Sequence, residues 1–110
     1  MNSLDTSFIN AQQRHKENPD TFEVPSNAEL EALAPKDFIK IGVRIFDPNS
    51  PIEAERFWLQ ITQIRNRVIY AKVDNDLVFT DYHSIADGDE LMLAPHHVLA
   101  ILRGDHECAN

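Results

Sequence analysis

The sequence predicts a single α+β domain in which one or two short N-terminal helices pack on a five-stranded antiparallel sheet. Three observations lead to this prediction. The chain has 110 residues, enough for one modest hydrophobic core and too few for two. Apolar residues make up 43% and charged residues 25%, as is typical of folded proteins. Helical spacing is confined to the first third of the chain, and beyond it apolar residues recur with a period of two between turn-forming residues.

Two short helices are predicted before the sheet. The first spans residues 4–15 and docks on the core through residues at helical spacing, namely Leu4, Phe8, Ala11 and His15. Ser26 and Glu29 have the spacing of a capping box, in which each side chain bonds to the other residue's backbone amide. They predict a second helix that ends near Leu33, because Pro35 cannot continue a helix.

The sheet is predicted from period-two alternation. Strands are expected over residues 37–46, 56–64, 68–73, 77–80 and 90–93. Alternation buries Phe57 and turns Trp58 outward, and Asn66 provides the left-handed backbone of a hairpin turn. Further turns are expected at 74–76 and 86–89, and residues 95–102 form either a closing strand or a one-turn helix followed by a strand. Such short strands predict a barrel-like sheet of the SH3-like kind.

The domain organisation is predicted as an N-terminal helical arm (1–18), one mainly β domain (19–103) and a flexible tail (104–110). We expect a cytoplasmic protein, because the chain has no signal-peptide pattern and no apolar segment long enough to cross a bilayer. Cys108 is the only cysteine, so no intrachain disulfide can form. A net charge of -8 opposes binding to nucleic acid or to an anionic membrane, and it favours either a basic protein partner or solubility alone. We expect a protein partner, and a monomer or a homodimer, because an exposed edge strand can pair with a second copy.

The stretch 73–90, "VDNDLVFTDYHSIADGDE", raises the question of a metal site. It contains six acidic residues, namely Asp74, Asp76, Asp81, Asp87, Asp89 and Glu90. A calcium loop requires oxygen ligands at alternating positions, whereas strand-like apolar residues follow each acidic pair. The histidines lack the spacing of a zinc signature. We therefore interpret the stretch mainly as turns and predict no metal site, no cofactor and no catalytic residue.

A hairpin with basic side chains is the first candidate for a binding surface. Arg56, Arg65, Arg67 and Lys72 are expected around it, next to Trp58 on its outer face. Stacking of single-stranded nucleic acid on such a surface is opposed by the acidic stretch that follows. Two alternatives are open for Trp58: the N-terminal helix covers it, or it is the aromatic anchor of a protein interface. The predicted binding residues are Glu55, Arg56, Trp58, Arg65, Asn75, Asp76 and His83.

Six motifs in order carry a resemblance to a known family. They are "TFEVPS" at 21–26, "KDFIKI" at 36–41, "ERFWLQIT" at 55–62, "IYAKVDNDLVFTD" at 69–81, "DGDELML" at 87–93 and "PHHVLAI" at 95–101. Their succession over about eighty residues resembles the small bacterial and phage domain of unknown function 2314 family. The resemblance implies a small, mainly β domain without an established activity. Two positions depart from the family pattern, since Lys36 and Ala71 stand where glycine is expected.

The predicted function is that of a non-enzymatic protein-binding module, which uses the sheet face or rim that carries Trp58, Arg56 and Arg65. A first alternative is an acidic inhibitor, of the immunity or phage type, whose carboxylates in 74–90 occupy a basic nucleic-acid site of its target. That alternative requires these carboxylates to lie on one continuous exposed face. A second alternative is a metal-dependent enzyme, which requires Glu55, Asp81 and His83 to converge in a concave pocket.

Overall fold

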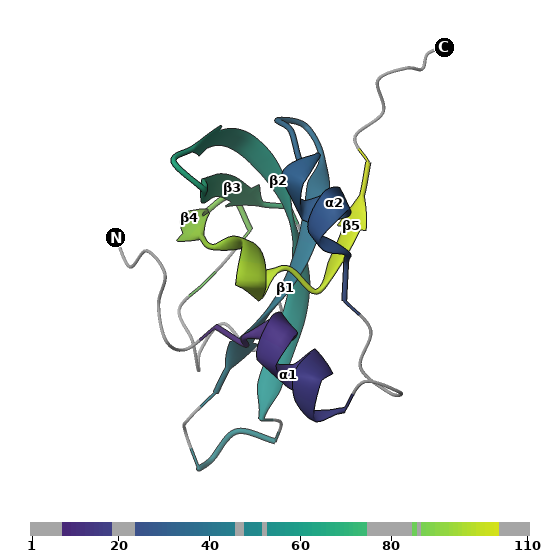
Figure 1. The fold of residues 1–110 in the computed structure, drawn as a ribbon. Helices are drawn as coiled ribbons and strands as arrows, with labels where there is room; N and C mark the ends of the chain where they lie inside the picture. Colours follow the sequence, from purple (N-terminus) through teal and green to yellow (C-terminus); the bar gives the residue numbers. More distant parts are fainter. Residues whose placement is uncertain are drawn as a thin grey trace.

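The computed structural model describes residues 8–18, 24–45, 48–51, 53–74, 85 and 87–103. Within these ranges the chain forms two short α-helices, a single turn of 3-10 helix and five strands (Figure 1). In chain order these elements are α1 (Ala11–Glu17), α2 (Asn27–Glu31), β1 (Phe38–Arg44), β2 (Ala54–Arg65), β3 (Val68–Val73), β4 (Glu90–Leu93), η1 (Pro95–His97) and β5 (Ala100–Leu102). The predicted α+β class is therefore confirmed. None of the described helices is long and apolar enough to cross a membrane.

The sheet is antiparallel and open, with the strand order β4-β3-β2-β1-β5. Among the described residues no ladder joins β4 to β5, so the prediction of a barrel-like sheet is wrong. The reason lies at the edge of β1. β5 pairs only with Phe38 to Lys40, and the rest of this edge is occupied by Phe8, which pairs with Val43, and by Ile9, whose amide donates to the Gly42 carbonyl at 2.9 Å. The strand predicted at 77–80 lies outside the described residues.

The first helix begins later than the sequence predicts. Asn10 caps α1, because its side-chain oxygen accepts a hydrogen bond from the Gln13 amide at 3.0 Å. Phe8 and Ile9 are consequently extended and lie against β1 instead of forming a helical turn. The helix does dock, as predicted, since Ala11 is fully buried and α1 lies beside η1 (Figure 1).

The capping box that was predicted for α2 is present. The Glu29 amide donates to the Ser26 hydroxyl at 3.1 Å, and the Ser26 amide donates to a Glu29 carboxylate oxygen at 2.8 Å. The hydrogen bond from the Ser26 backbone lowers the pKa of Glu29 below its usual value, with a smaller contribution from the Ser26 side chain. The helix ends at Glu31 with Ala32 as its C-cap, and the following residue, Leu33, packs in the core.

The hydrophobic core lies against one face of the sheet. The alternation predicted for β1 and β2 is confirmed, because Ile39, Ile41, Phe57 and Leu59 are all at most 1% exposed. The core continues into β3 and β4 and is covered by residues from the connecting segments, chiefly Phe8, Leu33 and Val98. Residues 95–102 take the second of their two predicted forms, a helical turn followed by a strand.

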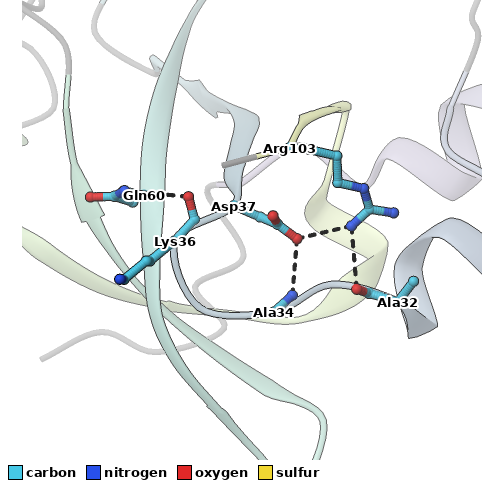
Figure 2. Close-up of polar contacts among 6 residues, drawn as sticks. All are labelled: Ala32, Ala34, Lys36, Asp37, Gln60 and Arg103. Carbon is cyan, nitrogen blue, oxygen red and sulfur yellow. Dashed lines mark hydrogen bonds and ion pairs between the residues drawn. The ribbon is translucent and has the colours of Figure 1, made fainter. Parts of the chain in front are cut away.

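Asp37 is a buried acidic residue that joins the start of β1 to the end of β5. It is 1% exposed, and its Oδ2 accepts hydrogen bonds from the Ala34 amide at 3.0 Å and from Arg103 Nη1 at 2.9 Å (Figure 2). The same guanidinium nitrogen donates to the Ala32 carbonyl at 3.3 Å. Asp37 thereby links the segment after α2 to the residue that follows β5.

The two positions at which the resemblance led us to expect glycine have different structural settings. Lys36 has a φ of 82°, in the left-handed region where glycine is favoured, and its carbonyl accepts a hydrogen bond from Gln60 Nε2 at 3.3 Å (Figure 2). Ala71 is fully buried on the inward face of β3 and has no positive φ. The backbone bend that glycine would serve is thus present at position 36 and absent at position 71.

The hairpin between β2 and β3 has a two-residue turn, Asn66-Arg67. The left-handed backbone predicted for Asn66 is confirmed by a φ of 52°, and Arg67 has a φ of 65° as well. Two positive φ values are characteristic of the type I′ turn, whose preferred second residue is glycine. Arg67 therefore holds a conformation that its Cβ disfavours.

Replacing Arg67 with glycine should stabilise the protein. Relief of the left-handed strain is worth about 1–2 kcal/mol and the added freedom of the unfolded chain costs about 0.5–1 kcal/mol, so we expect a net gain of about 0.5 kcal/mol. Urea unfolding of the wild type, Arg67→Gly and Arg67→Ala measures it. Arg67→Ala is the matched control, because it removes the same side chain and keeps the Cβ. Equal stability of the two variants would contradict the strain at this position.

Candidate functional site

Strand register places the predicted residues on two faces of the sheet. Residues that pair directly across a ladder share a face, and neighbours along a strand alternate between faces. Lys40 pairs with Trp58, and Gly42 pairs with Arg56. Both pairs lie opposite the core face, on a surface that we call the outer face. Its described residues from β1 to β3 include Phe38, Lys40, Gly42, Arg44, Arg56, Trp58, Gln60, Tyr70 and Lys72.

Trp58 stands near the middle of the outer face. Its side chain is half-buried, and Lys40 Nζ lies 5.8 Å from the centroid of the indole ring. A lysine over an indole ring contributes about 0.5–1 kcal/mol at an exposed site and holds the ring in one orientation. Trp58 is thus neither fully covered nor isolated. Sequence reasoning did not single out Lys40, although the alternation of residues 39–45 already placed it on the face of Trp58.

Arg56 lies beside Trp58 at the end of the sheet where β1 ends and β2 begins. It shares its row with Gly42, and a Cβ on Gly42 would lie only 2.6 Å from Cδ1 of Ile9. The absence of a side chain at position 42 therefore lets Ile9 pack onto the outer face next to Arg56. A cavity of about 400 Å³ lies here, and its lining includes Arg14, Arg44 and Arg56. Sequence reasoning missed this cavity, because Arg14 reaches it from α1.

The structure separates Arg65 from the centre of the predicted hairpin cluster. Arg65 is the last residue of β2, seven positions beyond Trp58, which corresponds to roughly 20 Å along an extended strand. Arg67 is in the turn at the same end. Lys72 remains near Trp58, because it pairs with Gln60 in the adjacent row. The outer face thus has its described cations at Arg44, Arg56, Lys40 and Lys72, and the hairpin tip has its own pair.

The remaining predicted residues are not on the outer face or are not described. Glu55 pairs with Val43 and therefore lies on the opposite face from Arg56, where it is half-buried. Asn75, Asp76 and His83 lie outside the described residues, as does Asp81. Because Asp81 and His83 are not described, the structure does not test whether they converge with Glu55, and this stays a prediction. In the described part of the chain no three His, Cys, Asp or Glu side chains are close enough together to hold a metal ion.

The two ends of the acidic stretch meet at one corner of the sheet. The Val73 amide donates to the Asp89 carbonyl at 2.7 Å, and the Gly88 amide donates to the Val73 carbonyl at 2.9 Å. Gly88 has a φ of 93° in the turn predicted there. These bonds bring Asp74, at the end of β3, beside the turn that leads to Glu90. Asp74 and Glu90 are both exposed.

A second depression, also of about 400 Å³, lies between α2 and the β2–β3 hairpin. Its lining is mainly apolar and includes Leu30, Leu33, Ile64 and Ile69, with Arg67 at its rim. None of the four predicted binding residues that the structure describes, namely Glu55, Arg56, Trp58 and Arg65, lines it.

Comparison with known proteins finds no matching family model, no matching curated protein and no matching solved structure. Membership of the domain of unknown function 2314 family therefore stays a prediction from the motifs. The candidate site rests on the geometry of the outer face alone.

Proposed function

We propose that the protein is a non-enzymatic, cytoplasmic protein-binding module of the domain of unknown function 2314 family, and that it takes its partner on the outer face. The Lys40–Trp58 pair is the observation that carries this proposal. Tryptophan and arginine are over-represented among the residues that dominate interface energies, and Trp58 has Arg56 two positions away on the same face. A half-buried indole still has ring surface for a partner to bury.

The charges of the outer face indicate what kind of partner fits. The chain has ten lysines and arginines and a net charge of -8, yet four of those cations lie on this face, where Glu90 of β4 pairs with Lys72. They surround half-buried aromatic side chains from three strands, namely Phe38, Trp58 and Tyr70. A partner surface with acidic side chains around an apolar pocket is complementary to this arrangement. The acidic remainder of the protein orients such a partner by repelling it from the other surfaces.

The partner test is affinity capture from the lysate of the source organism, followed by binding of the purified captured protein. We expect Lys40→Ala combined with Trp58→Ala to weaken binding by about 30-fold or more, because a central aromatic anchor is commonly worth at least about 2 kcal/mol. Lys16→Ala is the matched control, since Lys16 is an exposed lysine on α1. Amide chemical shifts on adding the partner should change on β1, β2 and β3.

Two outcomes would contradict the proposal. One is a partner that binds the folded double variant as tightly as the wild type, and the other is a set of shift changes confined to surfaces other than the outer face. Circular dichroism of each variant checks that it is folded. Arg65→Ala measures how far the contact extends along β2, since Arg65 is at the far end of that strand.

The acidic-inhibitor alternative is favoured by one observation, the meeting of Asp74 and Glu90 at one corner of the sheet. If this alternative is correct, the double variant Asp74→Asn, Glu90→Gln no longer binds the captured protein. The Trp58 variant still binds it. The captured protein should then also be a basic, nucleic-acid-binding one.

A further inference from the structure

Three arginines from three different elements line the cavity at the end of the sheet where β1 ends and β2 begins. Arg14 comes from α1, Arg44 from β1 and Arg56 from β2. Arg44 pairs with Ala54, and Arg56 pairs with Gly42 two positions away. Arg44 and Arg56 are therefore diagonal neighbours on the outer face, with their Cα atoms roughly 7–8 Å apart. The cavity, of about 400 Å³, also has Ile9, Ile45, Glu53 and Ala54 in its wall. We call it the arginine cavity.

None of these three guanidinium groups has a hydrogen-bond or ion-pair partner among the residues that the structure describes. Arg103, by contrast, is neutralised by Asp37 at 2.9 Å. Half of the six arginines in an acidic chain thus line one hollow, and among its described lining residues the single acidic one is Glu53. Like charges gathered in this way repel each other, and that repulsion is relieved when an anion binds between them.

We propose that the arginine cavity binds a small organic phosphate, specifically a phosphate monoester. Guanidinium groups present a planar fork of donors that matches phosphate oxygens, and three such forks can surround one phosphoryl group. Among the described lining residues, three arginines and Glu53 give a formal excess of two positive charges, which balances a monoester whose charge is about -1.5 to -2 at pH 7.

The size and the wall of the cavity account for the organic part of the ligand. Pockets for small molecules have volumes of roughly 300–1,000 Å³, and the arginine cavity falls within that range. Ala54, which is half-buried, and the exposed edge of Ile45 provide a small apolar surface beside the arginines, which inorganic phosphate would leave unused. This site does not depend on the proposed protein partner, because a free phosphate ester can bind to it in the absence of any protein.

The test uses the full chain, phenyl phosphate as the probe and amide chemical shifts as the readout. We expect saturable shift changes at Ile9, Arg44, Ala54 and Arg56. Arg44→Gln should weaken binding by about tenfold or more, because it removes charge-assisted hydrogen bonds. Arg14→Gln should also weaken phosphate binding, although Arg14 belongs to α1 and not to the sheet. Arg65→Gln is the matched control, an exposed arginine of the same strand as Arg56 that is outside the cavity, and it should leave the affinity unchanged.

Several results would overturn the phosphate site. Phenol binding as tightly as phenyl phosphate would show an apolar cavity only, and benzoate binding as tightly would show that phosphate is not preferred. Absence of saturable shifts, or equal loss of affinity in Arg65→Gln, would mean that the arginines act only through general surface charge. Arg44 and Arg14 are both exposed and outside the core, and a thermal melt confirms that each variant is folded. The Lys40 and Trp58 variants test the protein partner separately, so the two proposals can fail independently.

Discussion

Phe57→Ala is expected to lower the free energy of unfolding by about 3–5 kcal/mol. Phe57 is 1% exposed and belongs to the core cluster between β1 and β3. The truncation loses the stabilisation that comes from burying the phenyl ring away from water. It also leaves a cavity, which the strands paired on either side of β2 cannot close. Because domains of this size are stable by about 5–15 kcal/mol, the loss is a large fraction of the total.

Urea unfolding followed by the fluorescence of Trp58, the only tryptophan, measures this loss. Phe38→Ala is the matched control, since Phe38 is a half-buried phenylalanine on the outer face of the neighbouring strand. We expect it to cost less than half as much. Equal costs for the two substitutions would mean that the core is not confined to one face of the sheet.

Asp37→Ala is expected to lower the free energy of unfolding by about 2–4 kcal/mol. The substitution leaves the part-buried Ala34 amide without its acceptor and removes the anion that Arg103 contacts at 2.9 Å. Asp37 itself is 1% exposed, so the truncation also removes packed atoms from the interior. Thermal or urea unfolding of the variant gives the value directly.

Arg103→Ala separates the contribution of the Asp37–Arg103 ion pair from that of the hydrogen bond between Asp37 and the Ala34 amide. The Arg103 side chain is 47% exposed, so its ion pair is screened by solvent and its loss should cost less than the loss of Asp37. In a double-mutant cycle we expect a coupling of about 0.5–1 kcal/mol between the two residues. A coupling near zero would show that the turn at Ala34, and not the ion pair, accounts for the whole effect of Asp37. Hydrogen exchange of β5 amides should quicken in both variants.

Local sequence signals predicted the elements whose geometry depends on near neighbours. The capping box at Ser26 and Glu29, the alternation of β1 and β2, and the left-handed backbone of Asn66 each follow from a few adjacent residues. The first helix was placed too early for the opposite reason. Phe8 has helical spacing with its neighbours in the sequence. In the structure, however, Phe8 and Ile9 bond to the edge of β1, more than thirty residues away in the chain.

The candidate site shows the same division. Alternation on β2 was sufficient to place Arg56 and Trp58 on the outer face, and Glu55 on the other one. The position of Lys40 against Trp58 required the register between β1 and β2, because alternation fixes the face of each residue but not its partner along the strand. Arg14 joins Arg44 and Arg56 only because α1 follows the segment that pairs with β1.

The sequence by itself determined the fold class, the buried face of each long strand, the capping box of α2 and the turns at Asn66 and Gly88, because these depend on side-chain periodicity and on backbone preferences within a few residues. Only the tertiary structure decided that the sheet stays open, since β5 and the segment at Phe8 share the edge of β1. It alone also assembled the arginine cavity and the buried Asp37–Arg103 pair. Contacts between residues distant in the chain are set by packing and register, and neither leaves a pattern in a single sequence.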